Sequence, residues 1–220
     1  MSNDIDKLID KLAQQSAAAK HAAAKPLLPA NAVASAWLLA SVVAVAGIMF
    51  VIQPWRGGLL GEVTSSWRFA LEWVFAAVAL LCLALGAFRS AVPGERSGVI
   101  YAGFAATLLW AASIASGYIE PLLEPSMAGK RDGCYRETFY YAVVLAAFST
   151  LLLRRRYALQ PVKTALAASM FVAVLPAWLM QLFCMYEVHH GVTHHLLPGL
   201  AAGIIALPVV AVLIKPEKVG

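Results

Sequence analysis

Long apolar runs divide this chain, and they constrain its fold more than any other feature. A helix of about 20 residues crosses the roughly 30 Å of hydrocarbon in a bilayer. Because lipid cannot satisfy backbone polar groups, only helix bundles and closed barrels span it. The runs are rich in Ala, Leu and Val and lack the alternation of barrel strands. The sequence therefore predicts an all-α, polytopic membrane bundle of six transmembrane helices, over residues 33–52, 67–88, 97–118, 138–153, 163–185 and 194–214.

The composition agrees with a membrane protein. The chain is 61% hydrophobic and 13% charged, whereas a soluble domain carries roughly 25% charged residues. A formal charge of +5 is compatible with nucleic-acid binding, but the basic residues cluster at the ends of the apolar runs, as membrane topology requires. We therefore expect contact with membrane lipid and no direct contact with nucleic acid. The polar first 30 residues do not resemble a cleaved signal peptide.

The distribution of Lys and Arg predicts the orientation. With the amino terminus inside, 12 of the 17 basic residues fall on the cytoplasmic side, which satisfies the positive-inside rule. Both termini are then cytoplasmic. We divide the chain into a cytoplasmic segment, 1–30, and a six-helix transmembrane sensor domain, 31–220. The basic residues assigned to the outer side are Arg56, Arg68, Lys130, Arg131 and Arg136.

A short amphipathic helix is predicted near the amino terminus. Ile5, Leu8, Ile9 and Leu12 recur at helical spacing and form one apolar stripe. So short a helix is marginal in water unless something covers the stripe. The membrane surface and the protein's own cytoplasmic loops are two possible covers. The stripe lacks the aromatic anchors of a membrane-surface helix, which favours the third, a groove on a partner protein.

Two of the three cysteines are predicted to meet on the outer side. Cys82 lies within the second span and is interpreted as a small packing residue. Cys134 lies in the loop after the third span, and Cys184 lies at the end of the fifth. Both face what would be an oxidising compartment. They could form a stabilising disulfide, or they could be a pair that responds to oxidants or metals.

Histidines crowd the chain just after Cys184, in the run E-V-H-H-G-V-T-H-H. Imidazole and thiolate suit zinc or another soft transition metal. The candidate ligands are Cys134, Cys184, His190 and His194, although no C-x-x-C motif accompanies them. Two alternatives stay open. The histidines could be hydrogen-bonded residues at the membrane interface, or they could sense protons near neutral pH.

Few other residues indicate chemistry within the spans. Glu72 is the one carboxylate predicted well inside a span. An acid there is a candidate functional residue, or it could reach the interface or pair with Arg68 one turn earlier. Pro176 and Pro208 are possible kink points. A small transporter would use such features, whereas a membrane thiol oxidoreductase would need a C-x-x-C dithiol. No triad, phosphate loop or carboxylate pair is visible, so we expect no enzyme.

Several short motifs, in their order and spacing, resemble the NrsF family of membrane anti-sigma factors. They are D-x-L-I-D-x-L-A from Asp6 to Ala13, A-V-P-G from Ala91 to Gly94, and G-C-x-R from Gly133 to Arg136. A second cysteine closing the fifth span and a histidine opening the sixth complete the match. The resemblance covers nearly the whole chain.

The resemblance implies a function and a location. It implies that the amino-terminal helix binds an extracytoplasmic-function sigma factor and keeps it from RNA polymerase. It also implies that Cys134 and Cys184 sense oxidative or metal stress from the outer face of the bacterial cytoplasmic membrane. The protein then requires no cofactor, and a zinc or other soft transition-metal ion at the outer face would act as a stress signal. Our hypothesis is that modification of the cysteines favours one of two packings of the bundle and so releases the sigma factor.

Overall fold

The described residues of the computed structural model, 28–52, 59–90, 98–156, 158 and 160–215, form an all-α bundle. Six of its helices are long and apolar enough to cross a membrane, which confirms the predicted fold class and makes the chain a multi-pass membrane protein. These are α2 (Ala30–Ile52), α4 (Trp67–Arg89), α5 (Val99–Ser116), α6 (Cys134–Arg154), α7 (Pro161–Phe183) and the continuous helix Val188–Leu213. That last helix consists of α8 (Val188–His190), the π-helix η1 (Gly191–Leu196) and α9 (Leu197–Leu213), and a short α3 (Leu59–Ser65) lies before α4.

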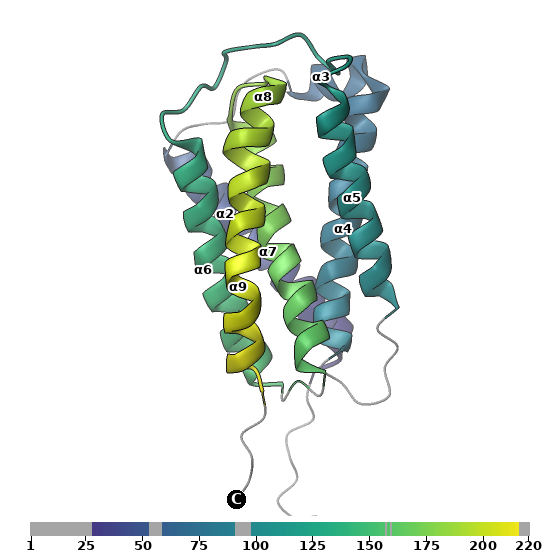
Figure 1. Ribbon diagram of the computed structural model, residues 1–220, viewed down its shortest axis with the longest axis vertical. Helices are drawn as coiled ribbons and strands as arrows, with labels where there is room; N and C mark the ends of the chain where they lie inside the picture. Colours follow the sequence, from purple (N-terminus) through teal and green to yellow (C-terminus); the bar gives the residue numbers. More distant parts are fainter. Residues whose placement is uncertain (1–27, 53–58, 91–97, 157, 159, 216–220) are drawn as a thin grey trace, which may run out of the picture.

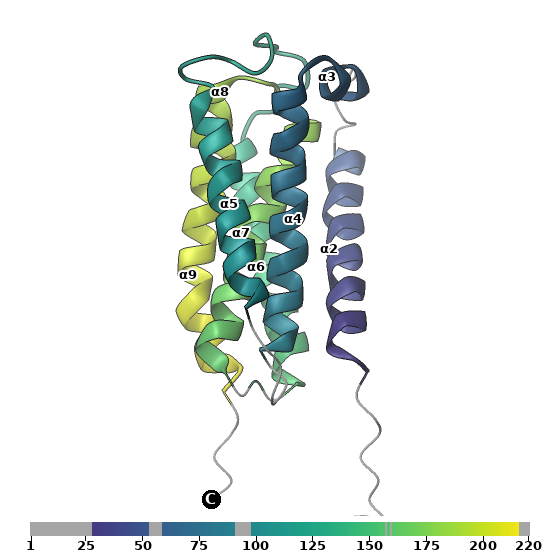
Figure 2. The ribbon, with the colours of Figure 1, turned by 90° about the vertical axis from the view of Figure 1, so that its right-hand side faces the viewer.

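The helices run side by side along the long axis of the molecule (Figures 1 and 2). The start of α2 and the end of α9 lie at the same end, which is the bottom in Figure 1. The segment 117–133, α3 and α8 lie at the other end, called here the upper end. The first span begins and the last span ends on the same side because the number of spans is even and each span reverses the direction of the one before it. The predicted amphipathic helix with Ile5, Leu8, Ile9 and Leu12 lies outside the described residues.

The fourth span begins earlier than predicted. The hydropathy pattern predicts a start at residue 138, whereas α6 begins at Cys134. This cysteine therefore belongs to the first helical turn and not to the preceding loop. Arg136 and Glu137 lower the hydropathy of this turn and hide its helical character. Gly133 ends the loop with a φ of +117°, a left-handed value that favours glycine. A glycine at this position therefore sets where Cys134 enters the helix.

Helix α7 is the centre of the bundle, and 72% of its most apolar 18-residue stretch is buried. Its close approach to α9 depends on small residues. A Cβ atom at Gly199 would collide with the carbonyl of Ala173, and one at Gly203 would lie 2.8 Å from the carbonyl oxygen of Ser169. Small residues at a spacing of four let membrane helices approach closely. This contact holds the histidine-bearing turn of η1 next to the end of α7.

Helix α2 lies at the edge of the bundle and packs on α4 and α7. Trp37 contacts Phe88 and Phe171, with ring centroids 5.4 and 3.9 Å away. An apolar groove of about 460 Å³ runs between α2 and α6. At its lower end α2 is fastened by a 2.8 Å hydrogen bond from the Arg89 Nε to the Asn31 side chain. Because α2 is the span that follows the amino-terminal segment, its attachments bear on function.

Candidate metal and thiol site

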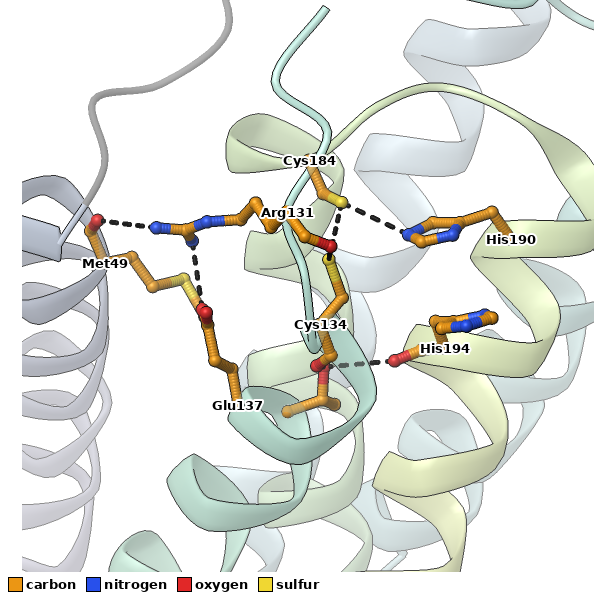
Figure 3. Close-up of polar contacts among 8 residues, drawn as sticks. Met49, Arg131, Cys134, Glu137, Cys184, His190 and His194 are labelled. Carbon is orange, nitrogen blue, oxygen red and sulfur yellow. Dashed lines mark hydrogen bonds and ion pairs between the residues drawn. The ribbon is translucent and has the colours of Figure 1, made fainter. Parts of the chain in front are cut away.

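Cys134 and Cys184 lie together at the upper end of the bundle (Figure 3). They are 50 residues apart in the chain, yet their Sγ atoms are 2.8 Å apart. Cys134 is the first residue of α6, and Cys184 follows α7 in an extended conformation. Both are fully buried. The pairing predicted from the topology is therefore a contact in the structure, at a distance about 0.8 Å longer than an S–S bond.

Two histidines complete a cluster around the sulfurs, called here the cysteine–histidine group: Cys134, Cys184, His190 and His195. The His190 Nε2 lies 3.2 Å from the Cys184 Sγ. One ligand atom from each of the four residues lies within 4.8 Å of the other three. Two thiolates and two imidazoles around a tetrahedral centre are a common zinc-binding set. The group could hold a metal ion of this soft or borderline kind.

His194, which the sequence analysis named as a ligand, is not in this group, and His195 takes its place. The His194 ring stacks on His190 with centroids 4.3 Å apart, and its Nδ1 lies 2.7 Å from the Thr193 hydroxyl. The reason is the π-helix at 191–196, whose wider turn brings residues five apart onto one face. In an α-helix, spacing by four would instead bring His194 to the face of His190.

The wide turn has a local cause in the chain. Pro198 has no backbone N–H, so in an α-helix the carbonyl of His194 would lose its partner four residues later. In the structure the Thr138 hydroxyl donates to the Cys134 carbonyl at 2.9 Å and lies 3.4 Å from the His194 carbonyl. Helix α6 thus places a polar hydroxyl beside the carbonyl that the proline leaves without an N–H. The same contact holds the histidine turn against the turn that carries Cys134.

The surroundings of Cys184 favour its thiolate form. The neighbouring Cys134 sulfur lowers the pKa of Cys184 below the ordinary value for a thiol, and His195 and His190 lower it further, although burial opposes them. The thiolate is the form that attacks oxidants and binds metals. Cys184 is therefore suited to attack an oxidant and to bind a metal ion.

Arg131 connects the cysteines to α2, a role that the sequence analysis missed. Its backbone carbonyl accepts a hydrogen bond from the Cys134 Sγ at 3.4 Å. Its guanidinium reaches across to α2, where it donates to the Met49 carbonyl at 3.2 Å, and it pairs with Glu137 at 3.2 Å (Figure 3). Met49 lies in the last turn of α2, where carbonyls lack partners within the helix and the helix dipole favours a cation. Arg131 thus fastens the upper end of α2.

Glu72 is buried within α4, only 2% exposed. Its carboxylate accepts hydrogen bonds from Ser113 at 3.3 Å and from the Gln181 side chain. Arg68, the partner considered in the sequence analysis, pairs instead with Glu120 at 2.9 Å. The Glu72 carboxylate is therefore not paired with Arg68. It is held by neutral groups from α5 and α7.

Oxidation of the purified protein is expected to join Cys134 to Cys184 and to leave Cys82 free, because only these two sulfurs are in contact. Diamide treatment, then denaturation and mass-tagging with a maleimide, should show two of the three thiols protected. Preloading with Zn²⁺ or Cd²⁺ should slow the oxidation of these two thiols, since a metal-bound thiolate is a poorer nucleophile. Three reactive thiols after diamide would contradict the pairing.

Fold and site together define a multi-pass membrane protein with a buried cysteine pair and a group that could hold a metal at one end of its bundle. No protein-family model, curated protein or solved structure matches the chain. The resemblance to the NrsF family therefore rests on the sequence motifs.

Proposed function

We propose that this protein is an anti-sigma factor of the bacterial inner membrane. Its amino-terminal helix binds an extracytoplasmic-function sigma factor, and chemistry at Cys134 and Cys184 releases it. The observation that carries the proposal is the contact of Arg131 with both the cysteine pair and α2. The buried cysteine pair is joined through Arg131 to α2, the span that follows the amino-terminal segment.

Oxidation and metal binding act on this connection in the same way. A disulfide forms when both thiols lose their protons and two electrons pass to the oxidant. A metal site forms when the thiols lose their protons to solvent. In either case Cys134 can no longer donate a hydrogen bond to the Arg131 carbonyl. Loss of this donor is therefore the signal shared by the two kinds of stress.

The two kinds of stress also require different separations of the two sulfurs. A disulfide holds them roughly 2.05 Å apart. A tetrahedral zinc site with Zn–S bonds of about 2.3 Å holds them about 3.8 Å apart. The two products therefore place the first turn of α6 differently relative to the end of α7. Arg131 lies three residues before Cys134 and moves with that turn.

A small change in free energy is enough for this switch. A signal shifts a two-state equilibrium only through its different affinity for the two states. A coupling of about 3 kcal/mol changes occupancy roughly 150-fold. Arg131 is buried and holds both the partly exposed Glu137 carboxylate and the Met49 carbonyl, and leaving a buried charge without its partners has an effect of this size. The attachment of α2 through Arg131 is thus strong enough to hold the resting state and weak enough to be released.

Binding of the partner is expected to depend on the apolar stripe of the amino-terminal helix. Leu8→Asp with Ile9→Asp should abolish co-purification of a sigma factor with the detergent-solubilised protein, because charge in a groove lined by apolar groups lacks a partner. Lys11→Ala, on the polar face, is the matched control and should retain binding. Deletion of residues 1–25 should act like the double substitution. A sigma factor that stays bound to the double variant would contradict the proposal.

The proposal requires that the upper end of the bundle face the periplasm and both termini the cytoplasm. Asp132 is exposed beside Cys134, so a cysteine placed there reports sidedness where the buried native thiols cannot. An Asp132→Cys variant should react with a membrane-impermeant maleimide on intact spheroplasts. Labelling only after the membrane is opened would reverse the topology.

A metal-handling protein is the second candidate, favoured by the metal-binding character of the cysteine–histidine group and by the buried carboxylate of Glu72. A transporter would move Zn²⁺ or Cd²⁺ into proteoliposomes, whereas the anti-sigma factor would bind the metal without moving it. An uptake assay with the purified protein separates the two.

A further inference from the structure

A small cavity at the upper end of the bundle joins the cysteine–histidine group to the buried acid in α4. Its volume is about 30 Å³, and residues of α4, α5, α7, α8, η1 and the segment 185–187 line it. The polar ones that matter here are Glu72 from α4, Trp110 from α5, Gln181 from α7 and His195 from η1. His195 therefore borders both the cavity and the thiols. No other member of the group lines this cavity.

Three buried polar atoms of the residues that line the cavity have no hydrogen-bond partner among the described residues. They are the Trp110 Nε1, the Gln181 Oε1 and the His195 Nε2. Leaving a buried donor or acceptor unsatisfied costs about 1–3 kcal/mol, so such atoms in native proteins are usually paired with ordered water. A water molecule needs at least about 10–15 Å³ and two to four polar partners. This cavity meets both conditions.

The donors and acceptors on the wall match a single water molecule. Such a water would accept from the Trp110 N–H and from an N–H of the His195 ring. It would donate to the Gln181 Oε1 and to the carboxylate of Glu72. Two donors and two acceptors complete its tetrahedral hydrogen bonding, and every unpaired polar atom on the wall is then satisfied.

We propose that a water bound in this cavity links His195 to Glu72 and makes Glu72 the outer carboxylate of the metal site. The inference deepens the proposed function and rests on its metal-binding part. A histidine that binds a metal nearly always donates its other ring N–H to a carboxylate, a carbonyl or a water, which fixes the ring and raises its basicity. Glu72 is then a positioning residue that acts through water and His195.

The role of Glu72 is specific to metal binding and is not needed for the disulfide. The disulfide joins only the two sulfurs, and His195 contributes no atom to it, so the extent of oxidation by excess diamide does not depend on how the His195 ring is held. A metal site, in contrast, needs the His195 ring held in one orientation and one tautomer. Replacing Glu72 should therefore weaken metal binding and leave oxidation unchanged. A merely structural role would change both.

The test measures Co²⁺ and Cd²⁺ binding to the purified full-length protein by thiolate charge-transfer absorption in competition with a chelator. Loss of an outer hydrogen-bond partner typically lowers metal affinity about 10–100-fold, and we expect this for Glu72→Gln. Trp110→Phe, which keeps the ring and removes the N–H, should lower the affinity in the same direction. Glu120→Gln removes an exposed carboxylate paired with Arg68 and is the matched control, with unchanged affinity.

The outcomes separate this inference from the proposed function. Unchanged metal affinity in Glu72→Gln, with wild-type protein that binds metal, overturns the role of Glu72 and leaves the metal response intact. Metal-free thermal unfolding and disulfide formation by diamide should both match wild type. A large change in either would show that Glu72 is structural and would overturn the inference. Wild-type protein that binds neither ion would end the metal response itself, and with it this inference.

Discussion

Replacing Arg131 with alanine is expected to turn on sigma-dependent transcription without any stress and to make it insensitive to oxidant and metal. Arg131 is 5% exposed, and its guanidinium joins Glu137 to the last turn of α2. Removing one partner of a fully buried ion pair costs about 3–5 kcal/mol, and because the Glu137 side chain is 25% exposed, we expect the lower end of this range. A loss of this size would detach the upper end of α2 and mimic the released state. A reporter gene driven by the sigma factor measures the effect, and we expect a rise of roughly 100-fold or more, in keeping with the coupling arithmetic.

Two further variants show whether the effect comes from the attachment of α2. Arg136→Ala removes an exposed arginine from the same segment and should behave as wild type. Glu137→Gln removes the ion pair but keeps the hydrogen bond from Arg131 to the Met49 carbonyl, so its basal transcription should be intermediate. Membrane abundance of each variant must match wild type. An Arg131→Ala protein that is present at normal levels and still responds to stress would show that the signal takes another route.

The membrane spans could be predicted from the sequence because a single property defines them. Apolar runs long enough to cross a bilayer leave no other fold for the backbone, and all six coincide with helices in the structure. The start of α6 was missed because Arg136 and Glu137 are charged while the turn is held by tertiary contacts. The Glu137 carboxylate pairs with Arg131, and Gly133 takes the left-handed conformation. Hydropathy does not report either interaction.

The cysteine pair could be predicted, but not the whole group around it. Topology alone places Cys134 and Cys184 at the same end of the bundle. The choice between His194 and His195 depends on a π-helical turn. That turn depends on Pro198 together with the Thr138 hydroxyl from another helix. A hydroxyl supplied from 56 residues away is invisible to any local spacing rule.

The roles of Arg131 and Glu72 were beyond sequence reasoning for the same reason. The sequence indicates only a charge on the outer side for Arg131, yet this residue is buried and donates to the Met49 carbonyl of α2. Helical spacing offers Arg68 as one possible partner of Glu72, whereas Arg68 pairs with Glu120 and Glu72 accepts from Gln181. In both cases a partner distant in the chain decided where a charged side chain points.

The hydrogen bond from Cys134 to the Arg131 carbonyl links the cysteine pair to the attachment of α2, and substitutions at Cys134 can separate its two functions. Cys134→Ser cannot form a disulfide and is a poor ligand for a soft metal, but its hydroxyl still donates to the carbonyl. We expect a low basal level of sigma-dependent transcription and no response to diamide or Cd²⁺. Cys184→Ser should also lose both responses. Cys82→Ser, in the middle of α4, is the control and should respond normally.

Cys134→Ala removes the donor as well as the sulfur, and it should therefore raise basal transcription several-fold while also failing to respond. The net free energy of a hydrogen bond is about 1 kcal/mol, which corresponds to roughly a fivefold change in an equilibrium. The contrast between serine and alanine thus measures the connection itself, apart from any thiol chemistry. Equal basal transcription in the two variants would show that the Arg131 carbonyl does not report the state of Cys134. Normal induction in both serine variants, Cys134→Ser and Cys184→Ser, would show that the sensor lies elsewhere in the protein.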